Sequence, residues 1–287
     1  MISKFRLAAL TTILGLLPGV CRADGFDSLK ESLIRLVSMS AHPQLNRFDY
    51  DGNGCLFGHL LNQGEQNAMI RTFEADKTYM ILGAGDNDVR DMDLWVTPSG
   101  QPDLRLAQDI DDDATPVVRF TPQRTARYAI NSRNERSNGL GFCTFVILVE
   151  SQYAQYGLKA LAESLDNIIA VARVRGLFAK EFPRNNLVLF GGKFENGESS
   201  SIFDLVYPRG HYAVVATGSS AIKDADLFVT RQSRAHDPAG REVARDDQQD
   251  STPDCEFSAD GVSSYGVEMK NARSTRSGFI FGFVLRD

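Results

Sequence analysis

The chain has 287 residues, a formal net charge of −6 at pH 7, and charged side chains at 24% of its positions. That length leaves room for two domains of about 130 residues each. Its Arg and Lys residues are scattered and form no basic stripe. An acidic chain of this kind is a poor candidate for binding nucleic acid or an anionic membrane surface, so we expect neither as a partner.

The first segment, residues 1–23, has the features of a secretory signal peptide. Lys4 and Arg6 give it a positive start, an apolar run follows, and Cys21 and Ala23 are small residues at the spacing for cleavage after Ala23. The run is too short to span a bilayer, and no later stretch reaches the required length. We expect a periplasmic or secreted protein without an integral membrane segment. An uncleaved anchor and a lipoprotein at Cys21 are the alternatives.

After the leader, the sequence consists of two similar copies in tandem. Residues 91–97 (DMDLWVT) return as residues 224–230 (DADLFVT), and Tyr79 returns as Tyr212. One register aligns both halves and shifts only at a short insertion around residues 236–240. We predict two domains, residues 24–150 and residues 151–287, and expect that positions kept in both copies are those the fold requires.

Each copy begins with an amphipathic segment. Leu29, Leu33 and Leu36 recur at helical spacing in the first copy, and Ser28 with Glu31 has the form of a capping box. The apolar positions of the second helix are Leu158, Leu161, Leu165, Ile168 and Ile169, and Gly176 is its expected end. Amphipathic helices usually cover their own core, so we expect packing on the sheets rather than a partner or membrane surface.

Short runs rich in β-branched and aromatic residues follow each helix, and turn residues separate them. About seven such runs per copy predict an antiparallel β-sandwich. In the first copy the expected strands are residues 55–60, 68–73, 79–82, 93–97, 117–120, 128–131 and 142–149. In the second copy they are residues 188–193, 201–206, 212–216, 226–230, 255–257, 264–269 and 278–285.

The order of these features resembles that of a known family. A strand from Tyr79 or Tyr212 leads to Asp-x-Asp-Leu-aromatic-Val, then a turn, an acidic loop, and a last strand opened by Gly-Phe. This is similar to the bacterial pre-peptidase C-terminal domain, which implies a jelly-roll-like sandwich. The family consists mostly of non-catalytic appendages of secreted hydrolases; some members bind calcium and some bind insoluble substrates such as collagen. This chain departs from the pattern because no catalytic domain accompanies the repeats.

Aspartates kept in both copies are the candidate metal ligands. Clustered carboxylates on loops suit a hard cation such as Ca²⁺, whereas single aspartates at strand ends accept backbone N–H bonds and shape turns. Both interpretations stay open, with calcium as the candidate cofactor. The shared positions are Asp91, Asp93, Asp109 and Asp113 in the first copy and Asp224, Asp226, Asp246 and Asp250 in the second.

A second calcium-like string covers residues 49–54 (DYDGNG). It follows the opening of an EF-hand loop, but Leu60 occupies the twelfth position, where that loop has a bidentate Glu. The second copy has Arg184 and two Asn residues there instead. The sandwich therefore does not require this string, and the missing ligand weakens a metal site here.

Trp95 and Phe228 share one strand position and are candidate binding residues. Alternation along the strand places Trp95 opposite Leu94 and Val96. If those two face the core, Trp95 lies outside and could stack on a sugar ring or anchor a protein. The alternative is that a helix or the other sandwich covers it.

Three cysteines follow the leader, and export permits a disulfide between two of them. Cys55 lies in the first strand of its copy and Cys143 in the last, and their counterparts Val188 and Ile280 are apolar. We therefore expect these strands to be neighbours, with a Cys55–Cys143 disulfide that leaves Cys255 as a buried thiol.

Catalytic motifs are absent from the sequence, which has neither His-Glu-x-x-His nor Gly-x-Ser-x-Gly. We expect an exported non-catalytic binding module whose partner is an extracytoplasmic protein or polysaccharide. The alternatives are a secreted hydrolase with its site between the repeats, and a purely structural component of the envelope.

Overall fold

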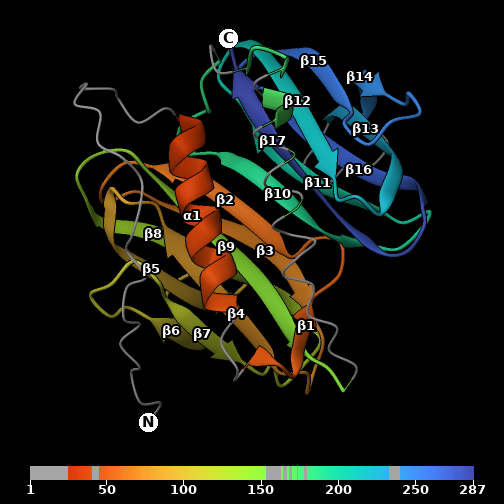
Figure 1. The fold of residues 1–287 in the computed structure, drawn as a ribbon. Coiled ribbons are helices and arrows are strands. Elements are labelled where there is room, and N and C mark those ends of the chain that lie inside the picture. Colours follow the sequence, from red (N-terminus) through yellow and green to blue (C-terminus); the bar gives the residue numbers. More distant parts are fainter. Residues whose placement is uncertain are drawn as a thin grey trace, which may run out of the picture.

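The computed structural model describes residues 25–40, 45–152, 163, 167, 170–172, 174–177, 180–232 and 240–287. The leader, the insertion near residues 233–239 and the apolar positions expected for the second helix lie outside these residues. The described chain is mostly β, with antiparallel strands that form two sandwiches, and this confirms the expected fold class (Figure 1).

The first sandwich contains nine strands. They are β1 (Phe48–Tyr50), β2 (Leu56–Leu61), β3 (Gln66–Phe73), β4 (Tyr79–Gly85), β5 (Val89–Pro98), β6 (Ala107–Asp109), β7 (Val117–Phe120), β8 (Ala126–Ser137) and β9 (Gly141–Glu150). One layer has the order β2-β9-β4-β7, with β1 on β9, and the other has the order β3-β8-β5-β6. Two layers of four antiparallel strands with these crossovers make a jelly roll.

The second sandwich has the same strand order. Its strands are β10 (Leu187–Phe194), β11 (Ser199–Val206), β12 (Gly210–Gly218), β13 (Ile222–Gln232), β14 (Arg241–Asp246), β15 (Asp254–Ala259), β16 (Ser264–Ser274) and β17 (Gly278–Arg286). The layers are β10-β17-β12-β15 and β11-β16-β13-β14. Sequence alone did not predict β1, β6 and β14, because the first two have only three residues and β14 is mostly charged.

The two sandwiches share one sheet. β10 pairs with β2 in antiparallel register, so that one layer from each sandwich joins into a nine-stranded sheet. Phe57 lies opposite Phe190, and Leu56 lies opposite Gly191. Because Phe57 and Phe190 occupy matching positions of the repeat, the pairing relates the two sandwiches by an approximate two-fold axis through this residue pair.

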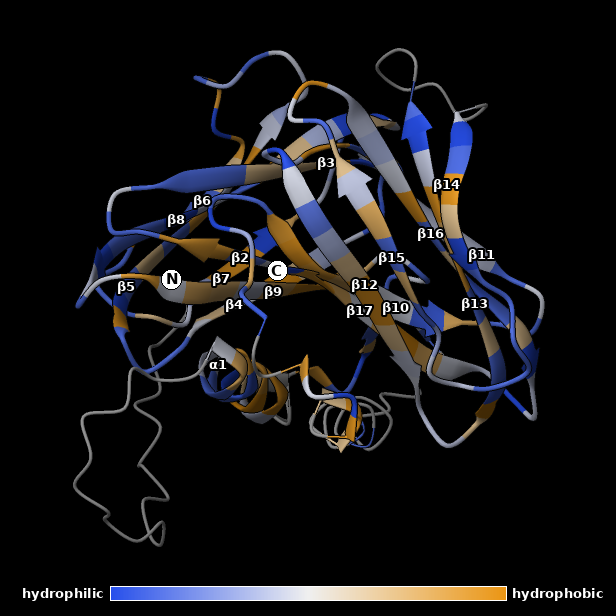
Figure 2. Ribbon diagram, turned by 90° about the horizontal axis from the view of Figure 1, so that it is seen from above, coloured by the Kyte–Doolittle hydropathy of each residue, from blue (hydrophilic) through white to orange (hydrophobic). Residues whose placement is uncertain are grey.

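Helix α1 (Gly25–Ser40) covers one face of this sheet, over β4 and β9 (Figure 2). Leu29, Leu33 and Leu36 are fully buried, as the apolar spacing predicts. The helix begins three residues before the expected Ser28, whose hydroxyl bonds to the Asp86 carboxylate instead of capping the helix. Residues 170–172 are also helical, and Gly176 has a φ of 67°, as expected for a residue that ends a helix.

The predicted disulfide between Cys55 and Cys143 is wrong. β2 and β9 are neighbours as expected, but the register places Cys143 opposite His59, and the Cys55 carbonyl accepts a bond from the Ile147 amide. Four residues of strand therefore separate the two cysteines, about 13 Å at ~3.3 Å per residue. A disulfide needs Cα atoms within about 7 Å. Both cysteines are buried free thiols, as is Cys255.

Candidate functional site

The acidic loop before β7 and its counterpart before β15 are each closed by a carboxylate at the matching position. Asp109 accepts bonds from the amides of Asp111 and Val117, at 3.2 and 2.9 Å. Asp246 accepts them from the amides of Gln248 and Asp254, at 3.1 and 2.9 Å. These carboxylates hold the loop closed over eight residues, which accounts for an Asp at this position in both copies.

The second shared loop position has the same role. Asp113 accepts bonds from the amide and hydroxyl of Thr115, and Asp250 accepts them from the amide and hydroxyl of Thr252. The Asp113 carbonyl also accepts a bond from Met92 on β5. All four loop aspartates are therefore engaged by the backbone of their own turns.

The strand aspartates lie beside basic residues. Asp93 is paired in register with Arg133, and Asp226 lies 3.6 Å from the Lys270 ammonium. Asp91 and Asp224 occupy matching irregularities of register on β5 and β13. Burial raises the pKa of Asp91, and the neighbouring Asp112 carboxylate raises it further, while Arg136 opposes the shift.

Among the described residues, no three His, Cys, Asp or Glu side chains gather closely enough to hold a metal ion. The two carboxylates of the string at residues 49–54 form ion pairs: Asp49 pairs with Lys193 at 3.0 Å and Asp51 with Arg71 at 2.5 Å. Calcium binding at the shared aspartates stays a prediction.

Trp95 is not an exposed platform. Its side chain is 4% exposed, although it lies on the face opposite the fully buried Leu94 and Val96. The chain between β5 and β6 folds back, and the Arg105 guanidinium lies 4.5 Å from the centre of the Trp95 ring. Phe228, at the matching position, is half-buried beside Arg245.

Contacts between the sandwiches concentrate on the loop that precedes β2. The Gly52 carbonyl accepts a bond from the Lys193 amide at 3.0 Å, and the Cys55 amide donates to the Gly191 carbonyl at 3.0 Å. The Asn53 side chain donates to the Ser199 carbonyl at 2.9 Å. The calcium-like string therefore joins the two sandwiches.

Glycines on β10 permit this approach. A Cβ on Gly192 would lie 2.5 Å from the Gly52 carbonyl oxygen and 2.5 Å from the Asn53 carbonyl carbon. Both of these atoms belong to the backbone, so no flexible side chain can move away to relieve the overlap. The position that holds His59 in the first sandwich must therefore be Gly in the second.

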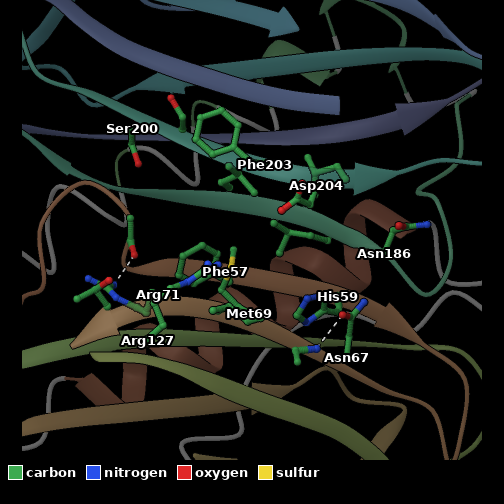
Figure 3. A pocket seen from close by; sticks show the side chains of 18 of the residues that line it. Phe57, His59, Asn67, Met69, Arg71, Arg127, Asn186, Ser200, Phe203 and Asp204 are labelled. Carbon is green, nitrogen blue, oxygen red and sulfur yellow. Dashed lines mark hydrogen bonds between the residues drawn. The ribbon is translucent and has the colours of Figure 1, made fainter. Parts of the chain in front are cut away.

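A groove of about 550 Å³ lies between the sandwiches (Figure 3). Its floor includes Phe57, His59 and Leu187 from the shared sheet, and its walls are β3 and β11. Three wall residues are large, apolar and exposed: Ile70 (44%), Phe203 (39%) and Val206 (51%). Polar groups also line it: Asn53, Asn67, Arg71, Thr72, Arg127, Asn186, Ser200, Ser201 and Asp204.

His59 lies beneath this groove as a neutral imidazole. It is 1% exposed, and burial lowers its pKa to about 3. Its Nδ1 lies 3.2 Å from the Ser132 hydroxyl, which is itself fully buried. A second pair, His211 and Ser258, lies on the surface at 2.9 Å. Among the described residues, no hydrogen bond joins either imidazole to a carboxylate of the kind that orients a catalytic histidine.

Comparisons with known proteins do not assign the chain to a family. No protein-family model matches the chain, and no curated protein sequence matches it significantly. A solved structure of the M60 catalytic domain with the CBM51-1 and CBM51-2 domains of ZmpB from Clostridium perfringens matches 79% of this chain at 6% identity and a TM-score of 0.24. This chain covers 34% of that one, so it spans about a third of its length.

Two further structures match over most of both chains. The PBSX exported protein XepA is 10% identical, with 80% of this chain and 84% of that chain covered, at a TM-score of 0.23. The CBM32-1 and CBM32-2 domains of the same Clostridium perfringens ZmpB are 9% identical, with 78% and 83% covered, at a TM-score of 0.24.

Sequence reasoning did not find the groove. It depends on the pairing of β2 with β10, and each of these strands alone has the pattern of an ordinary buried strand. The adjacent glycines Gly191 and Gly192 were the available signal, since Gly inside a strand often marks close approach of another backbone. No helix among the described residues is long and apolar enough to cross a membrane.

Proposed function

We propose that the chain is an exported, non-catalytic binding protein that holds an extracytoplasmic protein or polysaccharide in the groove between its two sandwiches. The observation that supports this most is the groove itself. Its volume of about 550 Å³ falls within the range of roughly 300–1,000 Å³ typical of ligand sites. It combines exposed apolar side chains with hydrogen-bonding groups, as binding sites do.

The rigidity of the join also supports the proposal. Backbone pairing of β2 with β10 fixes the distance between the groove walls, and Tyr50 packs against Phe279 of the other sandwich at 4.5 Å. Phe26 of α1 packs against Phe283 at 5.6 Å between ring centres. A preformed groove loses little conformational entropy when a ligand binds.

A binding screen with matched variants tests the proposal. Purified chain is measured against panels of polysaccharides and secreted proteins, together with Phe203→Asp in the groove and Val117→Asp on β7, at the outer edge of the first sandwich, where the residue is 41% exposed. We expect at least one ligand to bind the wild type and Val117→Asp equally but Phe203→Asp about tenfold more weakly. Equal binding to all three proteins contradicts a site in the groove.

The same preparation separates binding from hydrolysis. We expect no turnover of esterase, peptidase or glycosidase substrates. Turnover that is lost when one groove residue is mutated would replace this proposal with a secreted hydrolase whose site lies between the repeats.

Calcium support is part of the proposal only at the shared acidic loops. A cation that binds the folded chain alone raises its stability by about 2.7 kcal/mol at a hundredfold excess over Kd. Melting in millimolar calcium and in chelator measures this. An unchanged melting temperature would contradict calcium binding, and the aspartates would then serve only to shape the turns.

A further inference from the structure

The groove walls are strand edges that have no strand neighbour in the part of the chain that the structure describes. β3 and β11 each stand at the end of the strand order of their sheet, and each has eight residues. An unpaired edge presents a row of backbone N–H and C=O groups that can pair with another chain.

Other sheet edges of the described chain are short or charged. β6 has three residues and β7 has four. β14 (REVARD) contains four charged residues, and β15 (DCEFSA) contains two. In contrast, β11 (SSSIFDLV) has a single charge at Asp204 and no Pro or Lys. Charge, Pro, shortness and β-bulges are the usual protections against edge pairing, and the irregularity of β11 lies between Ile202 and Leu205, after its first four residues.

The directions of the free groups on β11 follow from its ladder with β16. The Asn271 amide donates to the Glu198 carbonyl at 2.9 Å, and backbone groups alternate between the two sides of a strand. The N–H and C=O groups of Ser199 and Ser201 and the N–H of Phe203 therefore point away from β16; the register of the ladder shifts between Ile202 and Leu205. The bond from the Asn53 side chain to the Ser199 carbonyl confirms this direction, since Asn53 belongs to the other sandwich.

Side chains along this edge leave it accessible. Residues 199–201 are serines, and the Phe203 ring lies over Gly266, where a Cβ would come within 2.9 Å of it. Phe203 and Val206 remain substantially exposed. The facing edge of β3 is more restricted, because the Arg71 guanidinium reaches to the Gly54 carbonyl at 2.6 Å and to Asp51.

We propose that the groove takes an extended polypeptide segment that adds as a strand to the free edge of β11. Its backbone pairs with Ser201 and Phe203, and apolar side chains at alternate positions contact Phe203, Val206 and Ile70. This inference rests on the proposed binding function and names the partner class: a polypeptide in strand conformation, recognised by main-chain hydrogen bonds with side-chain pockets for specificity.

Selected peptides and N-methylation test the pairing. A displayed library of twelve-residue peptides is selected on the full chain, and the synthetic winner is measured by fluorescence anisotropy with each backbone amide methylated in turn. We expect binding to weaken by about tenfold at every second amide over four to six residues, because only alternate amides face the edge. A winner whose affinity is insensitive to methylation, or sensitive without alternation, overturns strand addition.

Proline substitutions identify the edge. Ser201→Pro removes a groove-facing N–H without breaking a bond to β16, and Ser201→Thr keeps that donor. Ala68→Pro is the matching change on β3. We expect about tenfold weaker peptide binding for Ser201→Pro and near-normal binding for the other two, with circular dichroism and melting confirming that each variant folds. Loss confined to Ala68→Pro overturns the assignment to β11.

Failure of this inference differs from failure of the proposed function. If no peptide is selected while a polysaccharide binds with Phe203→Asp sensitivity, the polypeptide inference is wrong and the binding function stands. If no ligand of either class responds to Phe203→Asp, both are wrong.

Discussion

In the first sandwich Asp109 closes a loop by accepting two backbone amides, and in the second Asp246 closes the matching loop in the same way. Where the sandwiches meet, the matching positions differ: His59 is buried over Ser132 in the first, and Gly192 contacts the backbone of residues 52–53 in the second. The shared aspartates thus maintain the loops of each sandwich, whereas His59 and Gly192, which differ at matching positions, lie where the sandwiches meet.

The largest effect is expected where the two backbones touch. Gly192→Ala places a Cβ 2.5 Å from the Gly52 carbonyl oxygen, so the join must shift, and we expect a loss of about 3 kcal/mol of unfolding free energy. Denaturant unfolding measures it. Gly54→Ala in the same loop is the control, because its Cβ would meet only the Ser200 hydroxyl at 3.4 Å. Equal stability of the two variants would contradict a tight join.

His59 makes the first sandwich sensitive to acid. Its folded pKa is lowered to about 3 by burial, so between pH 6.5 and 3 the unfolded state binds more protons than the folded state. Stability therefore falls as the pH falls, by about 2 kcal/mol from this residue at pH 5.

A non-titrating variant isolates this contribution. His59→Asn keeps a polar atom near Ser132, and its stability should fall less between pH 7 and pH 5 than that of the wild type. Buried carboxyls such as Asp51 and Asp86, whose pKa values burial raises, act in the opposite direction in both proteins and cancel in the difference. Parallel pH profiles would mean that His59 is hydrated or charged in the folded state.

The turn aspartates should contribute to the stability of both sandwiches. Asp246→Ala removes the acceptor of the Gln248 and Asp254 amides, and we expect a loss of about 1 to 2 kcal/mol in thermal or denaturant unfolding. Asp109→Ala should cost less, because Asp109 is more exposed than the buried Asp246. A neutral Asp246→Ala would show that solvent satisfies these amides and that the shared Asp has another purpose.

Reducing agent should have the smallest effect. Because Cys55 and Cys143 are free thiols at opposite ends of the β2–β9 pair, we expect no change in melting temperature with reductant. Burial raises the pKa of Cys55 to about 12, so its thiol should also resist alkylation of the native protein. A drop in melting temperature on reduction would restore a disulfide.

Residue patterns were sufficient to predict the sandwiches but not to predict the groove. The expected strand at residues 117–120 matches β7, because alternation and turn residues are local signals. The Cys55–Cys143 error arose because neighbouring strands were inferred correctly while their register was not, and register depends on the whole ladder. The cover over Trp95 depends on Arg105 in a segment that was expected to be a loop.

Hydrogen exchange tests the central claim most directly, namely that the groove between the sandwiches is the binding site. The chain is compared alone and saturated with a ligand found in the binding screen, with amides followed in every strand. Our account predicts slower exchange in β11, above all at Ser201 and Phe203, and in the facing residues of β3. Protection confined to the acidic loops at residues 109–113 and 246–250, with β11 unchanged, would contradict it.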